Sequence, residues 1–461
     1  MPDQDKQAEQ VDVVVIGMGV GGEEVAGKLA ESGLTVIGVE RELVGGECPY
    51  WGCIPSKMMI RGSNLLAEAR RIDGIAGTAT VEPDFAPVAK RIRDEATDDW
   101  NDQVAVDRFD KLGGRFVRGD ARIDGPGRVV VGDTTFTARR GIVIATGSAP
   151  VVPPIAGLDT TPYWTNREAI STKQVPESLV VLGGGAIGLE LAQMFARFGS
   201  RVTVVEGIDR VLGPEEPEAS VLVTEALERD GITVQTGAKA VRIAREGDET
   251  VVTLEDSTTA RGAELLVSVG RHARVGDIGL ETVGLDPKAK AVEVDEWMRA
   301  GDGIWAVGDV TGVGMFTHMA MYQAGIAIND ILQRPGEPAD YRGLARVTFT
   351  DPEVGSVGMN EKAAREAGIN VRTGFTKVQT SARGWIHGPG GDGVIKLVED
   401  ADKGILVGAT SAGPVGGEVL SMLTLAVHAR VPVATLRTMV YAYPTFHRAV
   451  EDALADLENG Q

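Results

Sequence analysis

The chain has 461 residues, of which 43% are hydrophobic and 24% charged, as expected for a soluble globular enzyme of two to four domains. Its net charge of -20 disfavours nucleic acid as a partner. The first ten residues lack the basic start and apolar core of a secretion signal, and no run reaches about 18 apolar residues. We therefore expect a cytoplasmic protein without a membrane segment.

The first periodic element is an apolar run at residues 11–16, which predicts a strand, followed by a glycine-rich turn at residues 17–22. A helical stretch to about residue 32 and a second strand at residues 34–39 lead to Glu40. One Gly-x-Gly-x-x-Gly turn is weak evidence, but this turn has the strand, the helix and the acid in the expected order. The glycines allow a pyrophosphate to approach the helix N-terminus, and the carboxylate can accept a ribose hydroxyl.

The two cysteines of the chain, Cys48 and Cys53, are separated by only four residues. A structural framework needs several bridges, so an isolated close pair indicates a redox-active dithiol. Zinc needs four ligands, and the five histidines show no ligand spacing, so we predict no metal site. Pro55 and the helix formers from Lys57 onward predict a helix entry, whose positive end favours a thiolate.

A second unit of the same kind follows. Its predicted parts are a strand at residues 179–182, a turn at 183–188, a helix from 189 to about 198, a strand at 202–205, and Glu206. Two such units with matching acids predict two dinucleotide sites, one for a flavin dinucleotide and one for a nicotinamide dinucleotide.

The predicted electron donor is NADH. A carboxylate at Glu206 can bond a ribose diol but repels a 2'-phosphate. Arg210, four residues further, could instead receive a phosphate, although an arginine near a strand end is usually only solvated. NADPH therefore stays as the less favoured alternative.

Four further motifs follow the family order described next: Ala-Thr-Gly at 145–147, Gly-Arg at 270–271, Ala-Val-Gly-Asp at 306–309, and Val-Thr-Phe-Thr-Asp-Pro-Glu at 347–353. With both glycine turns and the cysteine pair ahead of Lys57, the chain resembles the FAD-dependent pyridine nucleotide-disulfide oxidoreductases. That family includes dihydrolipoamide dehydrogenase, glutathione reductase and mercuric reductase. The resemblance covers roughly residues 11 to 457.

This resemblance implies an α/β fold with two Rossmann-like dinucleotide-binding domains and an α+β interface domain at the C-terminus. The FAD-binding domain would comprise residues 11–150 and 272–340, and the NAD(H)-binding domain residues 151–271. Residues 341–461 would form the interface domain of a homodimer.

The resemblance also implies roles for individual residues. Cys53 would face the flavin as the charge-transfer thiolate, and Cys48 would attack the substrate. Lys57 and Glu190 match the family's ion pair beside the flavin, although an ordinary surface lysine and helix glutamate remain the alternative. The implied FAD contacts are Gly17, Gly19, Gly22, Glu40, Gly46, Lys57, Ala121, Thr146, Gly147, Asp309 and Ala320, with His318 as a structural residue beside the cofactor. The implied contacts of the nicotinamide nucleotide are Gly183, Gly185, Gly188, Glu206 and Gly270.

The C-terminal motif departs from the family pattern of His-x-His-Pro-Thr followed by a glutamate. Tyr443 stands where the catalytic histidine is expected, and Arg448 where its orienting carboxylate is expected. A phenol with a pKa near 10 is a poor base at pH 7 compared with an imidazole near 6.5. Tyr443 can still donate a hydrogen bond or contact a soft cation, and it resembles a tyrosine near this place in mercuric reductases. His447 could act as a surrogate base, and Glu451 is a weaker candidate for the missing carboxylate.

The departures leave the acceptor open. Tyr50 and Trp51 between the cysteines suggest a flat aromatic acceptor, or they pack as a wall. Mercuric reductases carry a second cysteine pair near the C-terminus, which this chain lacks. The leading hypothesis is reduction of a small disulfide; the alternatives are a quinone or metal-ion reductase, a dihydrolipoamide dehydrogenase with a surrogate base, and a redox-silent FAD-binding subunit or sensor.

Overall fold

The structure is a computed structural model that describes residues 8–458, and its contacts divide the chain into two compact units. The first unit contains the described part of Met1–Pro55 together with Lys90–Val151 and Arg271–Asp340. The second contains Ser56–Ala89, Val152–Gly270 and the described part of Tyr341–Gln461. Residues Ser56–Ala89, which the sequence places in the FAD-binding domain, thus make most of their contacts in the second unit.

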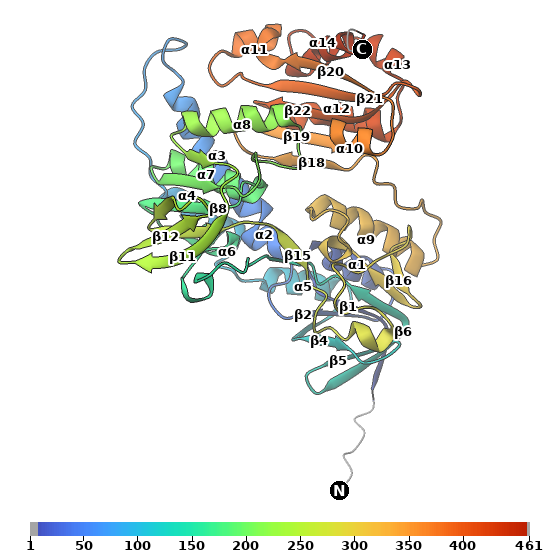
Figure 1. The fold of residues 1–461 in the computed structure, drawn as a ribbon. Helices are drawn as coiled ribbons and strands as arrows, with labels where there is room; N and C mark the ends of the chain where they lie inside the picture. Colours follow the sequence, from blue (N-terminus) through green and yellow to red (C-terminus); the bar gives the residue numbers. More distant parts are fainter. Residues whose placement is uncertain (1–7, 459–461) are drawn as a thin grey trace. The chain divides into compact units, whose positions relative to one another are not determined.

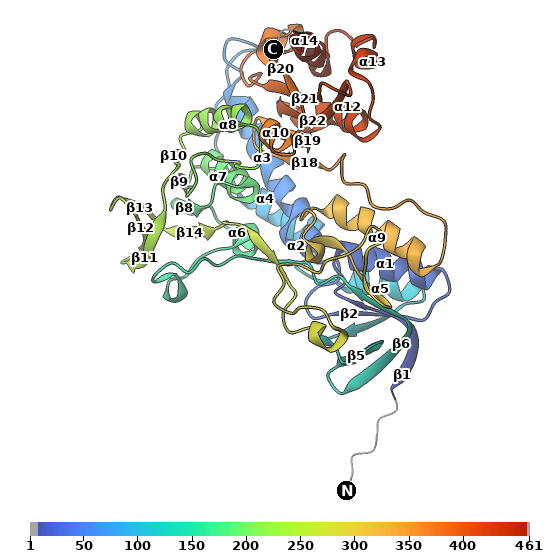
Figure 2. The same ribbon diagram turned by 45° about the vertical axis from the view of Figure 1, so that its right-hand side comes forward.

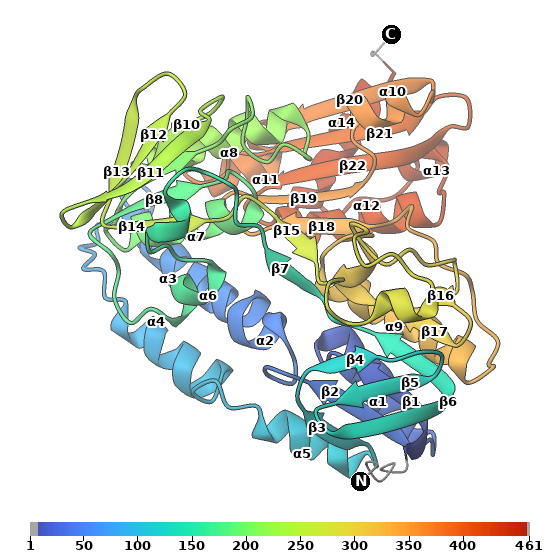
Figure 3. The same ribbon diagram turned by 60° about the horizontal axis from the view of Figure 1, so that its bottom comes forward.

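An eight-stranded sheet forms the centre of the first unit (Figure 3). Its elements are β1 (Glu9–Ile16), β2 (Val36–Glu40), β3 (Arg115–Arg118), β4 (Ala121–Ile123), β5 (Arg128–Val131), β6 (Thr134–Ile144), β16 (Arg299–Gly301) and β17 (Ile304–Ala306). The strand order is β16-β17-β6-β1-β2-β3, and β4 and β5 extend from β6 as antiparallel neighbours. β17, β6, β1, β2 and β3 are mutually parallel, so their carboxyl ends meet at one edge, where dinucleotides bind in such sheets.

Helices and a small sheet complete the first unit. They are α1 (Val20–Glu31), α2 (Glu47–Trp51), α5 (Gln103–Lys111), α9 (Thr317–Ile331), and the antiparallel pair β7 (Ser148–Pro150) and β15 (Arg271–Ala273). Strands β1, β6 and β17 contribute mainly apolar residues to the core, because both faces of these strands are covered.

The second unit begins with a parallel four-stranded sheet in the order β10-β9-β8-β14 (Figure 2). Its strands are β8 (Ser178–Leu182), β9 (Arg201–Val205), β10 (Thr233–Gln235) and β14 (Glu264–Val267), joined by the antiparallel sheet of β11 (Ala240–Glu246), β12 (Glu249–Leu254) and β13 (Thr259–Gly262). Its helices are α3 (Cys53–Arg70), α6 (Asn166–Ser171), α7 (Ala186–Arg197) and α8 (Pro217–Arg229). Helix α4 (Ala86–Arg91) crosses the boundary between the units at Lys90, and the π-helical turn Ile92–Ala96 that continues it belongs to the first unit. Cys53 itself, the first residue of α3, belongs to the first unit.

The C-terminal part of the second unit is an antiparallel five-stranded sheet in the order β18-β19-β22-β21-β20 (Figure 1). Its strands are β18 (Ala345–Thr348), β19 (Glu353–Gly358), β20 (Val371–Lys377), β21 (Val394–Asp400) and β22 (Ile405–Gly413). Its helices are α10 (Glu361–Glu366), α11 (Ala382–His387), α12 (Gly416–His428), α13 (Val433–Arg437) and α14 (Ala449–Asp456). Apolar residues of α12 and α14 pack against the sheet and form its core.

The fold class expected from the sequence is confirmed, but helix starts differ from the prediction. The second glycine turn was expected to end before a helix at residue 189, whereas α7 begins at Ala186. Gly183 has a φ of +110°, which completes the change of direction early, so that the extended residue Gly185 already serves as the N-cap. Within residues 8–458, no helix has both the length and the apolar character that crossing a membrane requires.

Candidate active site

The cysteine segment packs against the first glycine turn. Gly45 forms an isolated bridge with Gly19, and a Cβ atom on Gly46 would lie 2.9 Å from Gly19 Cα. Gly46 also has a φ of +68°, so both the space and the backbone favour glycine there. Cys48 lies in the first turn of α2, and Cys53 is the first residue of α3. The fold thereby places both thiols at the edge of the first dinucleotide-binding motif.

The two thiols lie close together, and the pKa of Cys48 is raised. Both cysteines are unbonded in this structure, and Cys53 Sγ lies 3.3 Å from Thr317 Oγ1 at the start of α9. The pKa of Cys48 is raised, first by its hydrogen bond with Cys53 and then by burial, although the contact with Thr317 opposes the shift. A raised pKa favours the protonated form of the Cys48 thiol.

The aromatic residues between the cysteines are not equally accessible. Tyr50 is 6% exposed, and its ring would lie 3.4 Å from a Cβ atom on Gly45. Burial raises the pKa of the Tyr50 phenol. Trp51 is partly exposed, with its ring centroid 6.0 Å from that of Tyr50. The packing alternative therefore fits Tyr50, whereas Trp51 remains able to contact an acceptor.

The first glycine turn fits a dinucleotide. A Cβ atom on Gly17 would overlap the carbonyl oxygen of Ala145, and one on Gly22 would overlap the carbonyl oxygen of Gly17. The Glu40 carboxylate accepts the N–H of Met18 at 2.9 Å and that of Glu42 at 2.8 Å. These two backbone donors fix the carboxylate at the end of β2, and its remaining lone pairs can accept ribose hydroxyls.

Asp309 is a half-buried carboxyl group in the same unit. Ser148 Oγ donates to Asp309 Oδ2 at 2.6 Å, and Arg271 Nε donates to Ser148 Oγ at 2.8 Å. Burial raises the pKa of Asp309, while the bond from Ser148 and the charge of Arg271 oppose the shift. A half-buried acceptor of this kind suits a sugar-like hydroxyl chain, because hydroxyls can satisfy it without bringing another charge.

The other residues predicted to contact FAD lie on separate elements of the first unit. Thr146 Oγ1 donates to the carbonyl of Arg274 at 2.7 Å, and Gly147 accepts the N–H of Arg274 at 2.9 Å. Ala320 is buried on α9, and Ala121 is the first residue of β4. Thr146 and Gly147 therefore join the end of β6 to the segment after β15, and Ala320 belongs to the helix that begins with Thr317.

The second glycine turn repeats the geometry of the first. A Cβ atom on Gly188 would overlap the carbonyl oxygen of Gly183. Glu206 accepts the N–H of Gly184 at 2.6 Å and that of Ile208 at 2.9 Å, the same two relative positions that bind Glu40. Two carboxylates, each at the end of a strand next to a glycine turn, are thus held in the same way.

Open space borders two other predicted glycines of this second motif. Among the described residues, no neighbour lies within 4 Å of a Cβ atom built on Gly185 or on Gly270. Gly185 is the N-cap of α7, so a phosphate can approach the free N–H groups at the start of that helix. Gly270 has a φ of +127°, a conformation that favours glycine.

Arg210 is bound within its own loop. Its guanidinium donates to the carbonyl oxygens of Gly213 at 2.6 Å, Glu215 at 2.9 Å and Leu212 at 3.4 Å, and to Ser220 Oγ at 2.8 Å. These bonds close the segment between β9 and α8. The arginine considered from the sequence as a phosphate ligand therefore has a structural role in the loop that follows Glu206.

Lys57 and Glu190 form an ion pair within the second unit. Lys57 Nζ lies 2.7 Å from Glu190 Oε2, and the Lys57 side chain is 35% exposed whereas that of Glu190 is 8% exposed. Glu190 Oε1 accepts the N–H of Phe349 at 2.8 Å, and the Phe349 ring lies 4.5 Å from Lys57 Nζ. The structure brings these two side chains together as the resemblance implied, and adds Phe349 as a contact that the sequence did not single out.

Thr317 and His318 occupy the start of α9. His318 stacks on Phe316, with ring centroids 5.3 Å apart and planes inclined by 12°. The hydroxyl of the neighbouring Thr317 contacts Cys53. The sequence indicates only that Thr317 precedes His318, and a threonine hydroxyl can bond many partners, so its contact with a sulfur atom distant in the chain could not be predicted.

The C-terminal tail presents Tyr443 to the surface. The Tyr443 side chain is exposed, the peptide bond between it and Pro444 is cis, and the Arg448 guanidinium lies 5.5 Å from the centre of its ring. Arg448 also pairs with Glu451 at 3.0 Å. Glu451, considered as a replacement for the missing orienting carboxylate, is therefore bonded to the arginine.

His447 lies in a 3-10 turn, Phe446–Arg448, rather than on α14. Its Nε2 atom is 3.4 Å from Thr445 Oγ1, and its ring is 6.2 Å from that of Tyr441. Burial raises the pKa of Tyr441 to about 12, with a further contribution from Glu451.

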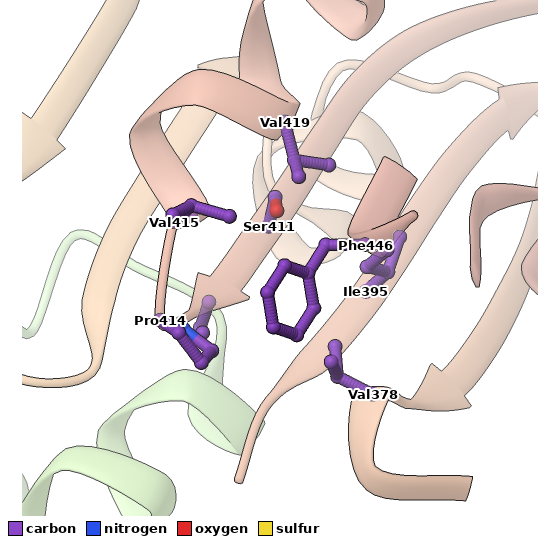
Figure 4. Close-up of a pocket in the computed structure, with 10 residues that line it drawn as sticks. Val378, Ile395, Ser411, Pro414, Val415, Val419 and Phe446 are labelled. Atoms are coloured by element: carbon purple, nitrogen blue, oxygen red, sulfur yellow. The ribbon is translucent and has the colours of Figure 1, made fainter. Parts of the chain in front are cut away.

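Phe446 of the tail lines a small apolar pocket that is open to solvent (Figure 4). Phe446 points into it and faces Val378 and Ile395 of the sheet side and Val415 and Val419 at the start of α12. Arg383 on α11 lies 5.4 Å from the centre of the Phe446 ring. Phe446, two residues after Pro444, packs against the core of the C-terminal sheet. Among residues 8–458, no three His, Cys, Asp or Glu side chains are grouped so as to hold a metal ion.

Two family models match most of the chain. The pyridine nucleotide-disulphide oxidoreductase model matches residues 11–324, and the dimerisation domain of that family matches residues 344–454. A dihydrolipoyl dehydrogenase from Chlorobaculum tepidum is 34% identical over 466 residues, which cover 99% of this chain and 99% of the relative. A mercuric reductase from Streptomyces lividans is 33% identical over 451 residues, or 95% and 94% of the two chains.

Solved structures show the same likeness. The Cu(II) complex of the HOCl-induced flavoprotein disulfide reductase RclA from Escherichia coli is 26% identical and has a TM-score of 0.84, covering 96% of this chain and 99% of that chain. LpdA from Mycobacterium tuberculosis is 25% identical with a TM-score of 0.84, covering 98% and 100%. The resemblance stated from the motifs is confirmed.

Proposed function

Since this chain belongs to the pyridine nucleotide-disulphide oxidoreductase family of FAD-dependent enzymes that take electrons from NAD(P)H, we propose that it uses NADH to reduce a small disulfide through Cys48 and Cys53. The overall reaction converts NADH, a proton and one disulfide into NAD⁺ and two thiols. FAD supplies the step between the two-electron hydride donor and the cysteine pair. The single observation that carries the proposal is the close cysteine pair beside the first glycine turn.

We propose the domain roles as follows. Residues 11–150 and 272–340 bind FAD, residues 151–271 bind NADH, and residues 341–461 form the interface of a homodimer. The match of the dimerisation domain to residues 344–454 supports the dimer. Gly17, Gly22 and Glu40 would hold the adenosine half of FAD, and Asp309 its ribityl chain, because glycine leaves room for the phosphates and the carboxylates accept hydroxyls.

The preference for NADH rests on Glu206 and Arg210. The Glu206 carboxylate is fixed at the end of β9 and would repel a 2'-phosphate, and the guanidinium of Arg210 is engaged by four oxygen atoms of its own loop. The guanidinium that could compensate the charge of a 2'-phosphate is therefore bound to oxygen atoms of its own loop. NADH is the donor that this arrangement favours.

The cysteines divide the substrate chemistry. Cys53, which accepts from Cys48 and contacts Thr317, would carry the negative charge of the reduced pair. Cys48 would lose its proton as it attacks one sulfur of the disulfide substrate, and the other substrate sulfur would leave as a thiolate that takes up a proton. Attack by Cys53 on the mixed disulfide then releases the second thiol and restores the Cys48–Cys53 bond.

That attack requires a proton acceptor, because the pKa of Cys48 is raised. We propose that the tail of the other subunit supplies Tyr443 and His447 near the cysteine pair. Tyr443 is exposed and Phe446 packs against the C-terminal core, so the tail has a packed base and an accessible tip. His447 is the better proton acceptor of the two by residue type, and Tyr443 is better suited to bind an acceptor.

A second candidate function is reduction of a quinone or metal ion, or dihydrolipoamide oxidation with a surrogate base. Quinone or metal-ion reduction is favoured by Tyr443 and Arg448 in place of the family's His and Glu, and by the naming of one relative as a mercuric reductase and of one similar structure as a Cu(II) complex. Dihydrolipoamide oxidation is supported by the relative named as a dihydrolipoyl dehydrogenase and would need the surrogate base. Metal or quinone acceptors need no proton transfer to a departing thiolate.

An anaerobic titration with NADH tests the proposal. At two electrons we expect a long-wavelength absorption band from the Cys53 thiolate, and this band should be absent in Cys53→Ser. Cys48→Ser can form no disulfide with Cys53, so it should show the band before NADH is added and lose it as the flavin takes up two electrons. This variant should also lose turnover with every disulfide that the wild type reduces. Undiminished disulfide turnover by Cys48→Ser would rule out the proposed route, and turnover with quinones or metal ions alone would favour the second candidate.

A further inference from the structure

Polar side chains line the contact between α3 and α7, which lie next to each other in the second unit (Figures 1 and 2). Lys57, Asn64 and Arg71 recur every seven residues along α3 and just beyond its end, so they share one face. On α7, Glu190 and Arg197 have the same spacing. Lys57 bonds Glu190, and Arg197 Nη1 donates to Asn64 Oδ1 at 2.7 Å. We call this row of residues the α3/α7 seam.

Asp351 closes the far end of the seam. Its carboxylate oxygen Oδ2 accepts from Arg197 Nη2 at 2.7 Å and from Arg71 Nη2 at 2.6 Å. Its backbone is held as well, since Gln193 accepts the Asp351 N–H at 2.7 Å and donates to the Asp351 carbonyl at 2.9 Å. One residue of the loop between β18 and β19 is therefore bonded to both helices through side chain and main chain.

The charges at this end of the seam are buried and compensated. Arg197 is 2% exposed and Gln193 is 3% exposed. Burial raises the pKa of Asp351, but the charges of Arg197 and Arg71 outweigh it, and the pKa is lowered overall. Asp230 also accepts from Arg197 and Gln193, each at 2.9 Å. Removal of the Asp351 charge would leave two guanidiniums with one fewer counterion in a low-dielectric setting.

The same loop supports the Lys57–Glu190 pair. Phe349, two residues before Asp351, donates its N–H to Glu190 and places its ring 4.5 Å from Lys57 Nζ. Lys57 and Glu190 are therefore oriented by one another and by Phe349. The position of Phe349 depends in turn on the anchoring of the loop at Asp351.

We propose that Asp351, held by Arg197 and Arg71, is a positioning residue for the Lys57–Glu190 pair. The inference rests on the proposed function and on the family resemblance, which implies that Lys57 and Glu190 lie beside the flavin, where the Lys57 cation would stabilise negative charge on reduced FAD. Asp351 acts through the loop: when it is bound, Phe349 fixes the second oxygen of Glu190, and Glu190 fixes Lys57. Without the bonds of Asp351, the Lys57 side chain can turn away from Glu190 toward solvent, because it is already 35% exposed.

The test is a double-mutant cycle on the FAD-loaded enzyme. The variants are Asp351→Asn, Lys57→Met and their combination, and the two readouts are the rate of flavin reduction by NADH and the midpoint potential of the bound flavin. We expect Asp351→Asn to slow reduction by about tenfold, as a small misplacement of a catalytic group does, and to lower the potential. In the Lys57→Met background, Asp351→Asn should change the rate of flavin reduction by less than about twofold. Asp351 is proposed to act through Lys57, so the effects of the two substitutions should not add.

Asp330→Asn is the matched control. Asp330 is also a carboxylate with a lowered pKa, held by Arg299 and by Trp305 Nε1 at 2.8 Å, but it lies in the first unit and makes none of the seam contacts. It should lower the melting temperature without changing the rate of reduction or the potential.

The outcomes separate the two proposals. If Lys57→Met leaves both readouts unchanged, the proposed role of the ion pair fails. If Lys57→Met changes them and Asp351→Asn does not, or if their effects simply add, the positioning role of Asp351 is wrong. Should Asp351→Asn fail to fold, Asn64→Ala removes one bond from Arg197 and should give a smaller loss of the same non-additive kind; an unchanged potential in Asn64→Ala would then overturn the inference.

Discussion

Replacement of Glu206 by glutamine should reduce the discrimination between NADH and NADPH. The carboxylate is held by the N–H groups of Gly184 at 2.6 Å and Ile208 at 2.9 Å, so glutamine retains one acceptor oxygen but brings an amide group against one of these donors. In the proposed site the Glu206 carboxylate accepts a ribose hydroxyl of NADH, and a hydrogen bond to a charged group contributes about 1.5–3 kcal/mol. Loss of that bond corresponds to a fall of about 10- to 100-fold in kcat/KM for NADH. For NADPH the repulsion of the 2'-phosphate disappears, so its kcat/KM should rise.

The assay is steady-state reduction of one acceptor with each nucleotide, and the control is Arg210→Met. Because the Arg210 guanidinium binds Gly213, Glu215 and Ser220, its removal should weaken the loop and raise KM for both nucleotides by similar factors. A selective loss of NADPH turnover in Arg210→Met would show that this arginine meets the 2'-phosphate. A wild-type enzyme that uses both nucleotides equally would refute the argument from Glu206.

Three further results are expected. Thr317→Ala removes the hydroxyl 3.3 Å from Cys53 Sγ and should raise the apparent pKa of the thiolate absorption in a pH titration of the two-electron-reduced enzyme; an unchanged titration would exclude Thr317 as a thiolate donor. The buried Lys396 ammonium lies 2.8–3.1 Å from Glu216, Glu218 and Glu361, and Lys396→Met removes it. Urea unfolding should then show a free energy of unfolding lower by about 3–5 kcal/mol. The exposed control Lys403→Met should lose far less. Asp351, whose folded-state pKa is lowered, contributes stability above its unfolded value near 3.8 that is lost as the pH falls through the folded-state pKa; acid unfolding curves of wild type and Asp351→Asn should converge there, and parallel curves would contradict this assignment.

Local sequence patterns predicted the two units of strand, glycine turn and helix. Each glycine turn lies between an apolar strand and a helix, because only residues without a Cβ atom fit where Gly22 meets Gly17 and Gly188 meets Gly183. Glu40 and Glu206 could be assigned from their place at the ends of β2 and β9. The domain boundaries and the roles of the site residues stay predictions. The start of α7 was predicted three residues late, since periodicity does not reveal how early Gly183 turns the chain.

The sequence by itself determined the fold class, the two dinucleotide motifs and the isolated cysteine pair, because each depends on residues close together in the chain. Only the tertiary structure decided the partners of long side chains. Arg210 binds its own loop, Thr317 reaches Cys53, and Asp351 joins Arg71 to Arg197. A guanidinium, hydroxyl or carboxylate can satisfy itself with many neighbours, and which neighbour it meets is set by how the helices and loops pack, not by the spacing of residues along the chain.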